Sequence, residues 1–207
     1  MSVVRFGTLC AMLLSSCSTA PRHSSLSATG SVTPSPGAAC AYDRGAMLAL
    51  SLSDFDQDME GGWRKIAYDD ECVAIAADLI RDYRESKGLS AYLLYWHEGQ
   101  LRASAGQTGR AVGLFQLSYK PPETDQEGWN FYVDATIAFL KKDQTALLGA
   151  RERLASLPRP KDFAPRDPEG RPVAISWPMN LHVVDAMIRC FGRSYDEAYS
   201  GCSNPPS

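Results

Sequence analysis

Residues 92–118 read YLLYWHEGQLRASAGQTGRAVGLFQLS, and this stretch decides the fold. In its first half, apolar side chains recur at three- and four-residue steps between polar ones, which predicts an amphipathic helix over residues 91–105. Gly106 then breaks the helix, and Thr108 is a suitable N-cap for a second helix that buries Phe115. Because so short a turn returns the chain on itself, the stretch predicts two antiparallel helices.

The same periodicity continues on both sides of this pair. Further helices are predicted over residues 71–83, 129–142, 145–157 and 180–190. Ser194 and Glu197 form a capping-box pattern at the start of a last helix. Only residues 47–52 and 171–176 suggest short extended pieces. The predicted fold class is therefore all-α, one domain over residues 40–207 built from antiparallel helix pairs.

The first pair resembles a tetratricopeptide repeat, whose period is about 34 residues. Gly99 occupies the small position of the first helix, and Trp129 follows Tyr95 by 34 residues, at the aromatic position of a second repeat. The small, large and small positions of the second helix are occupied by Ala111, Phe115 and Ser118. The likeness loosens beyond Trp129, where Val133 replaces a small residue. The prediction is either a tetratricopeptide-like array or an irregular helical bundle.

In that family, the first helix of each pair lines a concave groove that binds peptides or protein segments. The resemblance implies five groove residues here: Leu93, Trp96, Gln100, Asn130 and Asp134. Trp96 is the strongest candidate, because exposed aromatic side chains dominate interface energetics. The alternative for Trp96 is a place in the core between helices.

The N-terminal residues predict export. Arg5 precedes a short apolar run, and residues 14–17 read LSSC, so residues 1–16 form a secretory signal too short to span a bilayer. The last four residues resemble a bacterial lipobox, which implies a lipid anchor on Cys17 and, with serine at position 18, an outer-membrane location facing the periplasm. The alternative is an ordinary signal cut near Ala20. Residues 17–39 are rich in Ser, Thr and Pro, which predicts a flexible tether.

Four cysteines then remain for the mature domain: Cys40, Cys72, Cys190 and Cys202. An even number in an oxidising compartment predicts two disulfides, and three pairings are possible. We favour Cys40–Cys72 and Cys190–Cys202, because each joins neighbours in sequence and fixes a terminal segment to the body.

The search for chemical motifs excludes several classes. His97 and Glu98 begin a zinc-protease pattern, but Leu101 stands where the second histidine is required. Asp54, Asp56 and Asp58 alternate as in a calcium loop, yet the turn glycine and the bidentate glutamate are missing. We interpret this acidic run as the solvated start of a helix. No metal or cofactor is predicted, and a net charge of −3 gives no sign of nucleic-acid binding.

Residues 158–178 contain six prolines with charged residues between them. So long a connection is either a partner-binding loop or an unstructured excursion. Together these features predict a lipid-anchored protein, not an enzyme, that binds a protein or peptide partner. Two versions stay open: an envelope scaffold or assembly factor, and an immunity protein against a secreted toxin. The alternative function is a peptidoglycan hydrolase or lyase that uses Glu98 and nearby carboxylates, among which Asp134 could converge with Glu98 across two helices.

Overall fold

The computed structural model describes residues 40–167 and 170–202. All regular elements within these residues are helices. In chain order the elements are α1 (Arg44–Ala49), the π-helix η1 (Ser53–Gln57), α2 (Arg64–Ala67), the 3-10 helix η2 (Asp70–Cys72), α3 (Val73–Lys87), α4 (Tyr92–Ser104), α5 (Thr108–Leu117), the 3-10 helix η3 (Pro122–Thr124), α6 (Trp129–Leu140), α7 (Gln144–Ala155), α8 (Leu181–Arg189) and α9 (Tyr195–Tyr199). The described part of the chain contains no strand, so the all-α prediction is confirmed.

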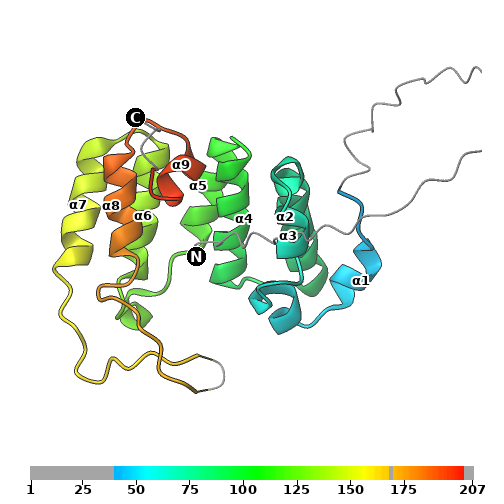
Figure 1. The fold of residues 1–207 in the computed structure, drawn as a ribbon, viewed down its shortest axis with the longest axis horizontal. Coiled ribbons are helices and arrows are strands. Elements are labelled where there is room, and N and C mark those ends of the chain that lie inside the picture. The colour runs from blue at the N-terminus through cyan, green and yellow to red at the C-terminus, as the bar shows by residue number, and fades with distance from the viewer. Residues whose placement is uncertain (1–39, 168–169, 203–207) are drawn as a thin grey trace, which may run out of the picture.

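The helices stand side by side in a row, with α1 to α3 at one end and α7 at the other (Figure 1). Consecutive helices form packed antiparallel pairs, as the sequence predicts. The pair α4 and α5 makes its closest approach at Gly99, where an added Cβ would lie 2.8 Å from the ring of Phe115. The small position indicated by the sequence is therefore a real steric requirement. The predicted helix start at Thr108 is off by one position, because Gln107 is the N-cap of α5.

The N-terminal elements α1 to α3 share one core with the inner face of α4. Phe55 stacks on Tyr83 with ring centroids 3.7 Å apart, which attaches η1 to α3. The Cys40–Cys72 disulfide ties the first described residue to the start of α3, as predicted. The extended piece expected over residues 47–52 is wrong, because the chain is helical there up to Ala49. Short helices are possible here because they pack on α3 and the disulfide holds them.

The elements α4 to α9 share the second and larger core. At the C-terminus, Ser194 and Glu197 form the predicted capping box at the start of α9. The predicted Cys190–Cys202 disulfide links the end of α8 to the residues after α9. In Figure 1, α9 lies between α8 and the α4–α5 pair. The short C-terminal helix therefore folds back onto the row instead of extending it.

The 158–178 connection is shaped by a few specific contacts. Trp177 donates from Nε1 to the carbonyl of Leu157 at 3.1 Å, and its ring packs edge-on against Phe163 with centroids 4.8 Å apart. The extended piece expected at 171–176 is not a strand: an isolated bridge between Arg166 and Pro172 is all that forms among its described residues. Its prolines supply too few amide donors for a ladder.

No helix among the described residues is both long enough and apolar enough to cross a membrane. The predicted signal, the lipid attachment at Cys17 and the tether before Cys40 lie outside the described residues.

Candidate functional site

Trp96, the leading groove candidate, is a core residue. Its side chain is only 3% exposed, and its ring lies 4.6 Å from Phe115, 4.8 Å from Trp129 and 4.7 Å from Tyr132, measured between centroids. The place in the core, which the sequence leaves open for this tryptophan, is the one it takes. Trp96 therefore holds α4 to α5 and α6 and offers no free face to a partner.

Gln100, the next predicted groove residue on α4, faces the chain's own C-terminal helix. Its Nε2 donates to the hydroxyl of Tyr195 at 3.5 Å, and one turn further Ser104 donates to Asp196. Burial raises the pKa of the Tyr195 hydroxyl well above its ordinary value. Leu93, near the start of α4, is partly exposed. On α4, α9 therefore covers the expected groove at Gln100.

Asn130 and Asp134 face in another direction. The amide of Asn130 makes two 2.9 Å hydrogen bonds to the backbone of Lys120, in the connection between α5 and α6. Asp134 accepts from the hydroxyl of Tyr119 at 2.6 Å and pairs with Arg153 of α7 at 3.1 Å. The predicted α4 and α6 residues therefore have separate partners and do not line one continuous groove.

The partners of Asp134 mark the edge of an open groove between α6 and α7. It has a volume of about 430 Å³. Its lining residues are Asp134, Ile137, Ala138, Lys141, Asp143, Thr145, Ala146, Gly149 and Arg153. Ala138, Ala146 and Gly149 leave the groove open because their side chains are small. The other lining residues include charges of both signs: Asp134, Lys141, Asp143 and Arg153. Burial, followed by the hydrogen bond and charge of Asp134, raises the pKa of the Tyr119 hydroxyl. Tyr119 therefore stays a neutral donor that helps to fix Asp134.

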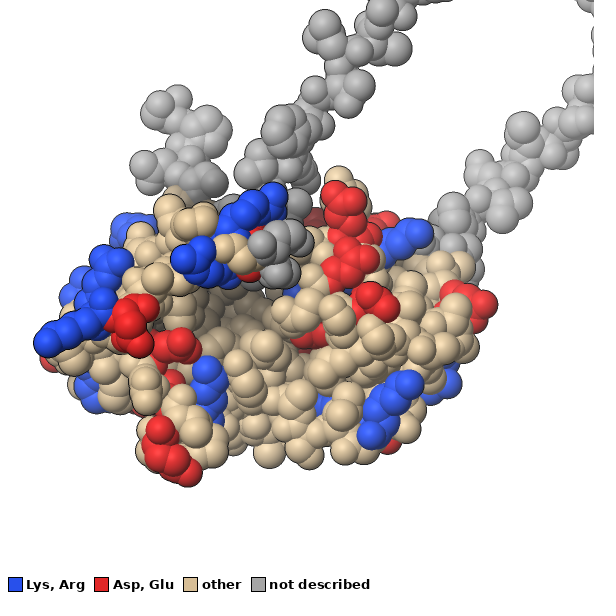
Figure 2. All heavy atoms as spheres, turned by 90° about the horizontal axis from the view of Figure 1, so that it is seen from below, with Lys and Arg blue, Asp and Glu red and all other residues tan. Residues whose placement is uncertain are grey.

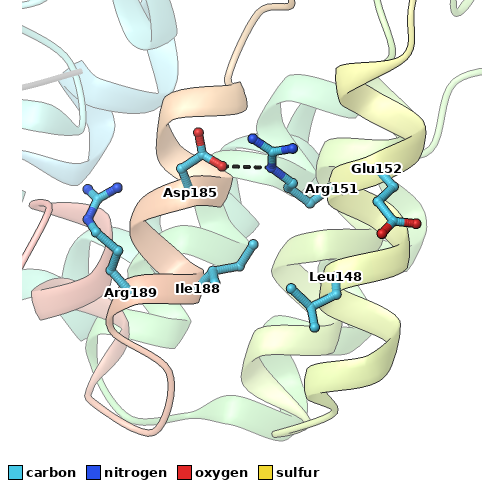
Figure 3. A pocket seen from close by; sticks show the side chains of 6 residues that line it. All are labelled: Leu148, Arg151, Glu152, Asp185, Ile188 and Arg189. Carbon is cyan, nitrogen blue, oxygen red and sulfur yellow. Dashed lines mark hydrogen bonds and ion pairs between the residues drawn. The ribbon is translucent and has the colours of Figure 1, made fainter.

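A second groove lies on the other side of α7, against α8 (Figure 3). Its volume is about 460 Å³, and it is lined by Leu148, Arg151, Glu152, Asp185, Ile188 and Arg189. Arg151 donates from Nε to Asp185 at 2.8 Å and so joins the two helices. Its lining residues also combine apolar side chains with both signs of charge.

The acidic run at residues 54–58, which was predicted to be solvated, contains one buried carboxylate, that of Asp56. Asp56 is 1% exposed, and its carboxylate meets Nδ1 of His97 at 2.7 Å and Nε1 of Trp63 at 3.0 Å. Burial alone would raise the pKa of Asp56, but the hydrogen bond and charge of His97, with bonds from Trp63 and Gln57, outweigh it and lower that pKa. The prediction of a solvated run is wrong at Asp56, because η1 turns its side chain toward α4.

Glu98 is also buried, between two guanidinium groups. Arg84 of α3 reaches its Oε2 at 3.0 Å, and Arg102, one turn along α4, lies 3.4 Å from its Oε1. Arg102 in turn reaches Asp78 at 2.6 Å. Buried charges need such partners. Glu98 is therefore a structural link between α3 and α4, and it shares no contact with Asp134. Among the described residues, Glu98 and Asp134 have different ion-pair partners and share no hydrogen bond. Residues four apart on a helix face each other, so the Glu98–Arg102 ion pair could have been predicted from the sequence.

Figure 2 shows the molecule from below, with a hollow near its centre and with basic and acidic side chains interspersed around it. Neither sign of charge dominates this face. Within residues 40–167 and 170–202, no three His, Cys, Asp or Glu side chains gather in a way that would hold a metal ion.

The fold and the grooves define a class of protein, an all-α row of antiparallel helix pairs with open, mixed-charge surface grooves. Comparisons with protein-family models, with curated proteins and with solved structures found no match.

Proposed function

We propose that this chain is a lipid-anchored, periplasm-facing protein that binds a protein or peptide partner in the groove between α6 and α7. The observation that carries the proposal is the form of this groove: an open trough with a small-residue floor and fixed charges at its edges. A deep, enclosed pocket would favour a small ligand, whereas an open trough suits an extended or helical segment of another protein.

The floor permits close approach. On α6, the groove is lined by the buried residues Ile137 and Ala138. On α7, it is lined by Ala146 and Gly149, whose side chains are a methyl group and a hydrogen atom. An added Cβ at Gly149 would meet nothing nearer than the Arg153 guanidinium at 3.5 Å. A partner segment can therefore lie against the α7 backbone, where apolar contact contributes most of the affinity.

The edges favour a partner with charges of both signs. Asp134 is held between Tyr119 and Arg153, so a segment that docks there meets a carboxylate already in position. Lys141 and Asp143 are exposed at the α6–α7 turn. Complementary charges at an interface rim set orientation and association rate more than affinity. Both the scaffold version and the immunity version of the function would use such a surface.

The test is site-specific photocrosslinking in intact cells that express the full chain. A photoreactive residue at Thr145, which is exposed in the groove, should give one adduct of constant mass. Gly149→Gln should abolish that adduct, because the long side chain fills the trough.

Gly113→Gln is the matched control. Like the partly exposed Gly149, Gly113 lies within a helix; it is exposed and has no atom within 4 Å of an added Cβ. The control should keep the adduct. An adduct that survives Gly149→Gln, or the absence of any adduct at Thr145, would show that the groove is not the binding site.

The lipid anchor has its own test. Cys17→Ala should move the protein from the membrane fraction to the soluble fraction after cell lysis, because one removed attachment site removes all acyl chains. Retention in the membrane fraction would contradict the anchor, whatever the result for the groove.

A further inference from the structure

The second groove, between α7 and α8, lies at one end of the helix row, beyond which the described residues form no further helix pair (Figure 1). In helical arrays the terminal face needs a polar cover to stay soluble. Here the face keeps apolar side chains: Leu148 is 42% exposed, and Ile188 is partly exposed on the facing helix. This end of the row therefore has the character of a contact surface.

The charges of the groove are balanced, with two of each sign. Arg151 and Asp185 neutralise each other across the groove at 2.8 Å. The other two, Glu152 and Arg189, make no side-chain hydrogen bond or ion pair with any described residue. In Figure 3, Glu152 lies on the α7 side and Arg189 on the α8 side, with Leu148 and Ile188 between them. Glu152 and Arg189 thus stand on opposite borders of a strip that holds Leu148, Ile188 and the Arg151–Asp185 pair.

We propose that a second copy of this chain covers this groove and that the two copies form a symmetric dimer. A two-fold axis that lies in the interface plane and runs along the groove exchanges its two borders, so Glu152 of each copy comes to lie over Arg189 of the other. The same rotation places the two strips face to face. Such an interface is isologous, and it joins the four unpaired charges of the two copies in two equivalent ion pairs.

Charge complementarity is what selects a second copy as the occupant. A partner with a net charge would leave one of the two free charges facing its own sign, which lowers affinity. The groove satisfies both charges when it meets itself. This inference concerns a different groove from the one proposed for partner binding and does not depend on it.

The test is sedimentation equilibrium of the full chain, purified in a density-matched detergent, with two charge reversals. Because of the symmetry, Glu152→Arg converts both attractive contacts into repulsive ones, and so does Arg189→Glu. Each exposed ion pair changes an association constant by up to about fivefold, so losing both attractive contacts weakens the dimer by up to about 25-fold, and the two new repulsive contacts add to this loss.

An equimolar mixture of the two variants is the decisive sample. In the mixed dimer, the new glutamate meets the new arginine and the native Glu152 meets the native Arg189, so association should return. Glu85→Arg, an exposed charge reversal on α3 at the other end of the row, is the matched control and should leave the dimer unchanged.

Three results would overturn the proposal. The first is a wild-type chain that stays monomeric at every concentration, which would leave the groove to another protein. The second is a mixture that associates no better than either variant alone, which would place the dimer contact elsewhere. The third is an equal loss of association for Glu85→Arg, which would make the effect a general one of charge.

Discussion

Replacing Gly99 with alanine tests the packing on which the α4–α5 pair depends. The added Cβ would lie 2.8 Å from Cε1, 3.0 Å from Cδ1 and 3.3 Å from Cζ of Phe115. Phe115 is fully buried, and its ring is packed against Trp96, so it has little room to move away. One methyl group therefore forces the two helices apart or the ring out of its rotamer.

Two effects of opposite sign decide the magnitude. Overpacking of this kind costs about 1–3 kcal/mol. Exchanging glycine for alanine inside a helix returns about 1 kcal/mol through backbone entropy. At Gly113, on the exposed side of α5, an added Cβ meets nothing within 4 Å, so Gly113→Ala should show the favourable effect alone. The free energies of unfolding of the two variants should therefore differ by about 1–3 kcal/mol, with Gly99→Ala the less stable.

Denaturant unfolding followed by circular dichroism, with both disulfides intact, measures this difference. A double-mutant cycle with Phe115→Leu adds a specific check, because removing the ring atoms nearest the new methyl group should reduce the penalty of Gly99→Ala. The reasoning is refuted if Gly99→Ala is as stable as Gly113→Ala, or more stable, or if the penalty is the same with leucine at position 115.

Two further predictions concern stability. Asp56→Asn should lower the free energy of unfolding near neutral pH by about 1.5–3 kcal/mol, since it removes charge-assisted hydrogen bonds. The folded-state pKa of Asp56 lies below 3.8, so its contribution to the free energy of unfolding is present above pH 3.8 and is lost as the pH falls through the folded-state pKa. The variant should therefore lose less stability in acid than the wild type. An equal loss for both proteins in acid denaturation would contradict this. Removing Cys40–Cys72, which spans 32 residues, by paired Cys→Ser changes should cost about 3.7 kcal/mol, against about 2.8 kcal/mol for the 12-residue Cys190–Cys202, in a loop-entropy account. The reverse order in thermal unfolding would show that lost native contacts outweigh loop closure.

Local patterns predicted most of the helices. Helix periodicity depends on neighbours in sequence, and so do turn glycines and the capping box at Ser194, which the structure reproduces. The disulfide pairing also followed, because each favoured bridge closes a short loop. The failures are local segments whose state depends on distant packing. Residues 47–52 have strand-like composition, yet contact with α3 makes the first part of them helical.

The candidate site was predicted less well, for a geometric reason. Repeat positions assign a side chain to a face of its own helix, but the neighbours of that face depend on how the pairs rotate against each other. Trp96 thus became a core residue, and Gln100 met α9, a helix 95 residues further on. Asp134 is part of a groove, but with α7 in place of α4.

By itself, the sequence determined the fold class, most helix positions and the two disulfides, because these follow from periodicity, capping and loop length over short spans. Only the tertiary structure decided which surfaces are open. The folding of α9 onto α4 covers Gln100, and α7 borders one open groove with α6 and another with α8. Burial depends on contacts between residues far apart in the chain, and such contacts cannot be predicted from the sequence around either residue. The same reason explains Asp56, whose buried bond to His97 joins residues 41 positions apart.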